Sequence, residues 1–122
     1  MKYRLLILIA LLCNASIDGL ANEDPAGCGN SNGPMLQVLG SGGPIADDGR
    51  ASSGYLIWIN GRSRFLIDAG GGVFLRFGEA GARFDDLDHI AISHFHTDHS
   101  TDRSSLLKSV FFSQRTRKLT IS

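Results

Sequence analysis

Three histidines and one aspartate occur within the six residues His94-Phe95-His96-Thr97-Asp98-His99. Neutral imidazole and ionised carboxylate are common ligands of Zn²⁺ and similar divalent ions. In an extended strand, His94 and His96 project to the same side, and a loop starting at Thr97 brings Asp98 and His99 to a second position nearby. The spacing predicts a two-metal hydrolytic site with ions ~3.5–4 Å apart. The alternative is a histidine-rich surface loop that binds no metal.

The segment matches the pattern His-x-His-x-Asp-His and resembles the metallo-β-lactamase-fold hydrolase superfamily. Four further stretches resemble its ribonuclease Z-like branch: residues 39–44 (LGSGGP) with Arg50, Ser53-Gly54, residues 65–70 (FLIDAG) and residues 111–117 (FFSQRTR). The resemblance runs from about Pro34 to Ser122. It implies an α/β fold, namely the N-terminal part of an αββα sandwich.

The same resemblance implies roles for individual residues. His94 and His96 are expected to hold one metal, and Asp98 and His99 the second, with Asp98 also counted as catalytic. The ions are expected to be two Zn²⁺ per complete domain, with Mn²⁺ or Fe²⁺ as alternatives. Asp68 is expected behind this loop, orienting a ligand, although an aspartate there could instead cap the next turn or helix.

A complete family site takes two more histidines and a bridging aspartate from the second half of the fold. Here the only other histidine is His89, expected at the far end of its strand, and no acidic residue follows Asp102. We therefore expect an N-terminal portion of a hydrolase, with little activity as it stands. Such a portion leaves an apolar sheet face and an unpaired edge exposed.

Hydrophobic patterning predicts the elements that position these residues. Strands are expected at residues 35–39, 55–59 and 64–67, the last two joined by a hairpin at Asn60-Gly61. A helix over residues 73–80 should stop at Gly81. A polar turn at 84–88 and a strand at 89–93 follow, then a helix over 100–112, where Asp102 suits the helix dipole. The apolar stripe of that helix is predicted to comprise Leu106, Leu107, Val110 and Phe111.

The N-terminus has the pattern of a signal peptide. Lys2 and Arg4 precede an apolar run at residues 5–12, and a small-x-small exit ends at Ala21. The run is too short for a permanent membrane span. The expected organisation is a signal peptide at 1–21, a flexible linker at 22–34 and an incomplete hydrolase domain at 35–122, in a periplasmic or secreted protein. Lipidation at Cys13 is the alternative to cleavage, and Cys28 is expected to be a bystander rather than a zinc ligand.

Lysine plus arginine and aspartate plus glutamate both number 12, so the net charge is zero and gives no general attraction to nucleic acid. Five basic residues follow Asp102, but export argues against RNA as substrate. The sequence therefore predicts an exported metal-dependent hydrolase of a small-molecule ester, such as a phosphodiester or sulfate ester, with no nucleic-acid partner. The alternatives are an inactive metal-binding remnant and a ribonuclease Z-like RNA endonuclease. The basic residues are Arg103, Lys108, Arg115, Arg117 and Lys118.

Overall fold

The structure, a computed structural model, describes residues 32–122. The predicted signal peptide, most of the predicted linker and both cysteines lie outside these residues, so export and cleavage after Ala21 stay predictions. Among the described residues, no helix is both long and apolar enough to cross a membrane.

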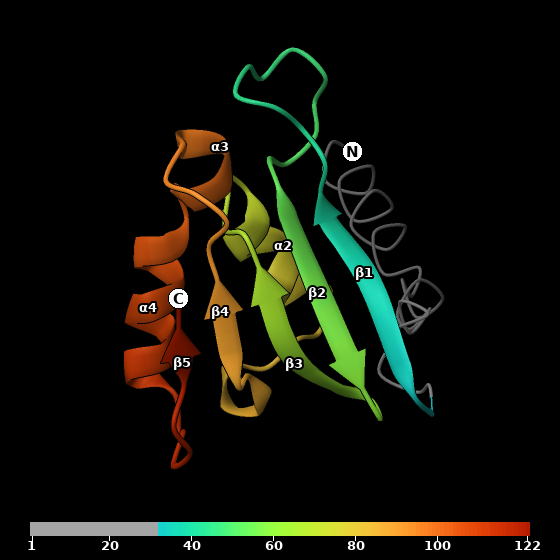
Figure 1. Cartoon of the computed structure of the whole chain (residues 1–122), viewed down its shortest axis with the longest axis vertical. Coiled ribbons are helices and arrows are strands. Elements are labelled where there is room, and N and C mark those ends of the chain that lie inside the picture. The colour runs from blue at the N-terminus through green and yellow to red at the C-terminus, as the bar shows by residue number, and fades with distance from the viewer. Residues whose placement is uncertain (1–31) are drawn as a thin grey trace, which may run out of the picture.

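Five strands form one mixed sheet in the order β1-β2-β3-β4-β5 (Figure 1). The first three, β1 (Pro34–Gly40), β2 (Gly54–Ile59) and β3 (Arg62–Ile67), pair antiparallel. The last three pair parallel, with β4 (His89–Ala91) between β3 and β5 (Thr120–Ile121). The predicted α/β class is therefore present as a single sheet with helices.

The β2–β3 connection is the predicted hairpin. Asn60 and Gly61 have φ of 50° and 73°, which is the left-handed pair that a type I′ turn requires. The structure starts β3 at Arg62, two residues earlier than the sequence indicated, because its pairing with β2 continues to the turn. Both hairpin strands are thereby fixed in register.

Within residues 32–122, three helices and one 3₁₀ turn accompany the sheet. Helix α2 (Val73–Glu79) lies behind the sheet in Figure 1, and the 3₁₀ turn η2 (Phe84–Asp86) leads into β4. Gly81 has φ of 68°, so the predicted helix stop is confirmed. The predicted helix over 100–112 is divided into α3 (Thr97–Ser100) and α4 (Arg103–Phe112).

The core lies between one face of the sheet and the helices. Fully buried side chains come from β2 and β3, from the side of α2 that faces the sheet, and from α4. Each large aliphatic or aromatic side chain removed from water in this way stabilises the fold by about 1.5–3 kcal/mol. The core comprises Leu56, Leu66, Val73, Phe77, Leu87, Ile90 and Leu106, with Leu39, Trp58 and Ala69 beside them.

The predicted apolar stripe of the last helix is partly wrong. Leu106 is fully buried, but Phe111 is 79% exposed and Phe112 is 67% exposed. The reason is the orientation of α4, which begins at Arg103. Of its side chains, only Leu106 is fully buried in the core. The aromatic end of the helix therefore faces away from the sheet.

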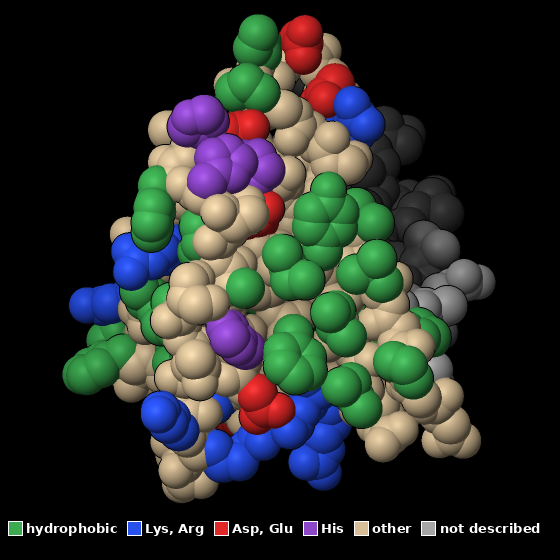
Figure 2. Space-filling model, in the orientation of Figure 1, with side chains coloured by type: hydrophobic (Ala, Val, Ile, Leu, Met, Phe, Trp, Pro, Cys, Tyr) green, Lys and Arg blue, Asp and Glu red, His purple; other side chains and the backbone are tan. Residues whose placement is uncertain are grey.

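The opposite face of the sheet carries a continuous apolar surface. Register places Leu36, Ile57 and Phe65 in one cross-strand row, and Val38, Tyr55 and Ile67 in the next. Leu36 and Val38 are 63% and 56% exposed, and Figure 2 shows hydrophobic side chains gathered over β1, β2 and β3. The predicted exposure of one apolar sheet face is thus present among the described residues.

Candidate functional site

The histidine segment follows β4 at the upper end of the sheet in Figure 1, where the carboxyl ends of β3 and β4 meet. The strand predicted over residues 89–93 is two residues too long, because β4 ends at Ala91, and His94 and His96 lie in the loop after it and not in an extended strand. The Ser93 amide donates its hydrogen bond to the Asp68 carboxylate at 2.8 Å instead of to a neighbouring strand. With this bond the strand pairing of β4 stops, and the chain continues as a loop.

The three imidazole rings nevertheless gather in one place. The ring centroid of His94 lies 4.7 Å from that of His96 and 4.1 Å from that of His99. Phe95, between the first two, is 74% exposed and points away from them. Helix α3 begins at Thr97 and carries His99 back toward His94. The histidines are therefore brought together by a loop followed by one helical turn, and not by a strand followed by a loop.

Asp68 lies behind the histidine loop and contacts it twice. It is 4% exposed, one carboxylate oxygen accepts the Ser93 amide, and the other accepts Nδ1–H of His99 at 2.7 Å. Because a carboxylate only accepts hydrogen bonds, the Nδ1 of His99 carries a proton, and in the neutral imidazole the lone pair is then on Nε2. The aspartate therefore orients this histidine as a metal-binding histidine is usually oriented.

The environment of Asp68 favours its ionised form. Burial by itself would raise the pKa of its carboxyl group, but the hydrogen bonds from Ser93 and His99 outweigh burial and hold the pKa below its usual value. Its backbone has φ of 60°, a left-handed conformation that aspartate tolerates better than most residues. The two side-chain bonds hold this conformation in place.

Asp98 also lies within the cluster. Its side chain is 14% exposed, and its Oδ2 is 3.4 Å from Nε2 of His99. The carboxylate of Asp98 and the free nitrogen of His99 therefore face one another. Both groups are donors that a divalent cation accepts.

Backbone hydrogen bonds attach α3 to the ends of β2 and β3. The Ser53 amide donates to the Asp98 carbonyl at 3.0 Å, and the Ala69 amide donates to the His99 carbonyl at 2.7 Å. Gly70 lies so close to the Asp98 carbonyl that a β-carbon there would collide with it. The sequence signal for these contacts is the run Ala69-Gly70-Gly71-Gly72, whose small residues allow the backbones to approach closely.

Asp102 lies at the start of α4, as predicted, and has a second role that was not predicted. Its carboxylate makes no capping bond to α4 but accepts the amide of Phe74 at 2.9 Å, in the first turn of α2. The capping function considered for Asp68 is therefore supplied here by Asp102. The Asp102 amide in turn donates to the Ala69 carbonyl at 2.8 Å, which connects both helices to the loop after β3.

His89 lies outside the cluster, at the start of β4, where its Nε2 is 2.8 Å from the Ser122 hydroxyl. The nearby acidic turn is engaged in ion pairs: Asp88 contacts both Arg64 and Arg117, and Asp85 contacts Arg83. These pairs give the acidic turn a structural role.

The donor set fits a divalent metal ion by its chemistry. Imidazole nitrogen and carboxylate oxygen are the ligands that zinc takes, and the carboxylate–imidazole pair of Asp68 and His99 is typical of metal-binding histidines. As the side chains stand, no three histidine, cysteine or acidic residues in the region 32–122 converge closely enough to hold an ion.

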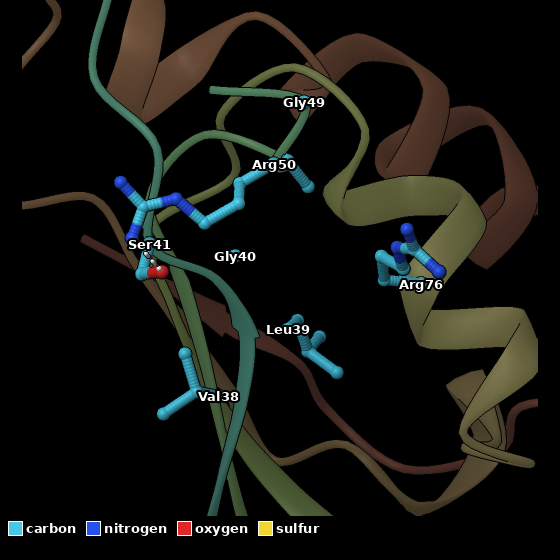
Figure 3. Close-up of a pocket in the computed structure, with 8 residues that line it drawn as sticks. Val38, Leu39, Gly40, Ser41, Gly49, Arg50 and Arg76 are labelled. Carbon is cyan, nitrogen blue, oxygen red and sulfur yellow. Dashed lines mark hydrogen bonds between the residues drawn. The ribbon is translucent and has the colours of Figure 1, made fainter.

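A separate hollow of about 300 Å³ lies between the glycine-rich loop after β1 and helix α2 (Figure 3). Arg50 points toward Ser41 in this view and donates to its hydroxyl at 3.3 Å, while its guanidinium also pairs with Asp48 at 2.7 Å. Arg76, on the opposite wall, pairs with Glu79 at 2.7 Å. Both arginines are thus already paired with carboxylates, and none of the four clustered ligand residues lines this hollow.

Comparisons with known proteins agree with the geometry. Residues 34–122 match the family described as Anti-Pycsar protein Apyc1. The chain is 39% identical over 75 residues to ribonuclease Z of Mycobacterium sp. (strain KMS), and 37% identical over 89 residues to that of Clostridium acetobutylicum. These alignments cover 60% and 71% of this chain but 26% and 28% of the relatives. The chain therefore spans about a quarter of the length of the curated relatives it matches.

Solved structures show the same fold. The metallo-β-lactamase fold protein YhfI from Bacillus subtilis superposes with a TM-score of 0.62 at 28% identity, over 74% of this chain and 36% of that protein. The short form of human tRNase Z gives 0.60 at 23% identity, over 70% of this chain and 32% of that protein. The resemblance to the ribonuclease Z-like branch of the metallo-β-lactamase fold, and the fold class it implied, are confirmed.

The prediction of a small-molecule ester partner, with no nucleic acid, is wrong. The curated relatives are ribonucleases, which are named for action on RNA. The prediction depended on the signal-peptide pattern, because export argued against RNA as a substrate even though all charged residues after Asp102 are basic. A local positive surface can attract a polyanion even when the whole molecule is neutral.

Proposed function

Because this chain belongs to the family described as Anti-Pycsar protein Apyc1 and has the ribonuclease Z-like metallo-β-lactamase fold, we propose that its histidine cluster serves a metal-dependent nuclease that hydrolyses phosphodiester bonds of RNA. The observation that carries the proposal is the hydrogen bond between the buried Asp68 carboxylate and His99 Nδ1. It sets the His99 lone pair on Nε2, beside His94 and Asp98. A surface loop without a metal has no need of such an arrangement.

In this proposal His94 and His96 hold one divalent ion, and Asp98 and His99 hold the second. Zn²⁺ suits the nitrogen and oxygen donors, and Mn²⁺ or Fe²⁺ are alternatives. When bound, such ions polarise a phosphoryl oxygen and lower the pKa of a water molecule. The whole protein's activity is part of the proposal, since this chain corresponds to about a quarter of the relatives' length.

The residues of this chain contribute orientation. Asp68 fixes the tautomer and the ring plane of His99, and the Ser93 amide fixes Asp68. The backbone bonds from Ser53 and Ala69 hold the main chain of Asp98 and His99 at the sheet edge. A preformed arrangement of this kind reduces the cost of ordering the ligands when the metal binds.

The metal part of the proposal is tested by adding Co²⁺ to the chain and recording its visible absorption, which reports imidazole and carboxylate coordination. His96→Ala should remove most of the signal, whereas His89→Ala, which changes a histidine outside the cluster, should retain it. Equal signals from both variants would contradict the assignment.

The nuclease part is tested with the protein expressed from its complete reading frame and an end-labelled RNA. We expect cleavage with Zn²⁺ or Mn²⁺, loss of cleavage on chelation, recovery when metal is restored, and no cleavage by His96→Ala. An RNA that stays intact beside a metal-loaded, folded protein would refute the proposed substrate class.

A further inference from the structure

Three exposed aromatic rings, the exposed Lys108 and the half-buried Arg103 lie along one surface that starts at the histidine loop. We call it the α4 face and define it by Phe95, Arg103, Lys108, Phe111 and Phe112. Figure 2 shows hydrophobic and basic side chains following one another below the histidines, along the side of the molecule where Figure 1 places α4.

Each end of the α4 face combines a cation with an aromatic ring. The guanidinium carbon of Arg103 lies 5.9 Å from the centre of the Phe95 ring, and the Lys108 ammonium lies 5.1 Å from the centre of the Phe112 ring. The ring of Phe111 meets that of Phe112 edge-on, with centroids 5.3 Å apart. Exposed phenylalanine rings beside cations are the groups that stack on bases and contact phosphates in single-stranded nucleic acid.

The Lys108 side chain is exposed, whereas Arg103 is half-buried with its Nε enclosed. Within the part of the chain that the structure describes, no ion pair includes Arg103 or Lys108. Arg115 and Arg117, in contrast, donate to backbone carbonyls and to Asp88, so they brace the acidic turn. Two of the basic residues after Asp102 are therefore structural, and two belong to the α4 face.

We propose that the α4 face binds a single-stranded segment of RNA and leads it to the histidine cluster. The proposal rests on the proposed nuclease function, which supplies the reason for an RNA to approach this end of the sheet. Phe95 stands between His94 and His96 in the chain, so the face begins at the cluster itself. A helix of the length of α4 extends about 15 Å, which is enough for a few nucleotides.

Two other occupants fit the α4 face less well. A second copy of the chain would place Arg103 and Lys108 against the same cations, and no acidic residue follows Asp102 to offset them. A membrane surface would need a continuous apolar stripe. Between its aromatic ends, however, the exposed side of α4 carries Ser104, Ser105 and Lys108. A polyanion with exposed bases matches both the charges and the rings.

The test measures binding apart from cleavage. The full chain is titrated, with a chelator present, into a fluorescein-labelled oligouridine of about 12 nucleotides, within the usual range of single-strand sites, and anisotropy is recorded. Phe112→Ala should weaken binding about tenfold, as expected for the loss of one stacked base. Phe112→Trp should retain affinity, and Phe112→Leu should not, because leucine keeps the apolar surface but cannot stack.

Lys108→Gln should weaken binding several-fold and reduce the slope of log affinity against log salt by about 0.7, the value for one phosphate contact to a single strand. Matched controls are Leu75→Ala, an exposed apolar residue on α2, and Arg62→Gln, an exposed cation at the hairpin. Both controls should bind RNA like the unchanged chain.

Several outcomes overturn the inference. These are no RNA binding by the unchanged chain, equal effects of the α4 and control variants, binding to anionic lipid vesicles in place of RNA, or a dimer that Phe112→Ala dissociates. Because binding is measured without metal, failure of the nuclease proposal appears separately, as bound RNA that metal does not cause to be cleaved.

Discussion

Asp68 and His99 are joined at 2.7 Å between carboxylate and Nδ1 although 31 residues separate them in the chain. Asp68 directly follows the last residue of β3, and His99 lies in the helical turn after the histidine loop. Because Asp68 also accepts the Ser93 amide, a single buried carboxylate fixes both the start and the end of the ligand segment. The conformation of the candidate ligand segment therefore depends on a residue that is not itself an expected ligand.

Asp68→Asn should weaken metal binding about 10- to 100-fold, the usual effect of removing the partner of a metal-binding histidine. Asparagine tolerates the same left-handed backbone, so the variant isolates the carboxylate charge. Stability should fall by about 1.5–3 kcal/mol through loss of charge-assisted hydrogen bonds. Zn²⁺ affinity measured against a chromophoric chelator, together with urea unfolding, checks both effects. Asp47→Asn, in the exposed loop, is the control and should change neither quantity.

The elements with strong local signals were predicted from the sequence alone. The Asn60-Gly61 hairpin and the helix stop at Gly81 depend on backbone preferences of a few neighbouring residues, and both are present. The end of β4 depends on a bond between Ser93 and Asp68, residues 25 positions apart. No local pattern reports such a contact, which explains why the strand was predicted to continue to the histidines.

In the candidate site, too, features set by neighbouring residues were predictable and features set by distant contacts were not. Residue types and spacing within one short segment predicted four candidate ligands, and the structure places these side chains near one another. The role of Asp102 could not be predicted, since its partner Phe74 lies 28 residues earlier and on another helix. Exposure of Phe111 likewise depends on how α4 meets the sheet. Periodicity alone indicated only that an apolar stripe exists.

Asp102→Ala should destabilise the fold by about 1 kcal/mol, the typical effect of removing a side-chain acceptor from a helix N-terminus. The affected helix is α2, because the Asp102 carboxylate accepts the Phe74 amide. Hydrogen exchange should therefore accelerate at Phe74, while the amides of α4 change less. Asp86→Ala is the control, since this aspartate lies outside that contact. Faster exchange confined to α4 would show that the assigned partner is wrong.

The exposed ion pair of Asp48 and Arg50 should be lost at acidic pH, when Asp48 is protonated. A hydrogen bond from the Arg50 amide, followed by one from its guanidinium, lowers the pKa of Asp48 below its usual value. Because the pKa of Asp48 is lower in the folded protein, the interaction is fully present at pH values above the ordinary aspartate pKa of about 3.9. It is lost as the pH falls through the lower, folded-state pKa. Carboxyl chemical shifts followed over pH should show this. Arg50→Gln should raise the pKa toward its usual value without restoring it fully, because the backbone bond remains.

Gly70→Ala should damage both the fold and the metal site. A β-carbon at this position would collide with the carbonyl of Asp98 and approach the Ser52 side chain. The Asp98 carbonyl cannot move freely, because it accepts the Ser53 amide. We expect destabilisation of about 3 kcal/mol, the upper part of the usual range for overpacking, and weaker Co²⁺ or Zn²⁺ binding as the backbone of Asp98 and His99 shifts.

Gly78→Ala provides the matched control for the same substitution. Gly78 lies within α2, and a β-carbon there would meet nothing within 4 Å. Alanine should stabilise this helix by about 0.5–1 kcal/mol by reducing the entropy of the unfolded chain, and metal affinity should not change. Urea unfolding and metal titration of both variants distinguish the two sites. If Gly70→Ala kept full metal affinity, the close packing of β3's end against α3 would not be what positions the ligands.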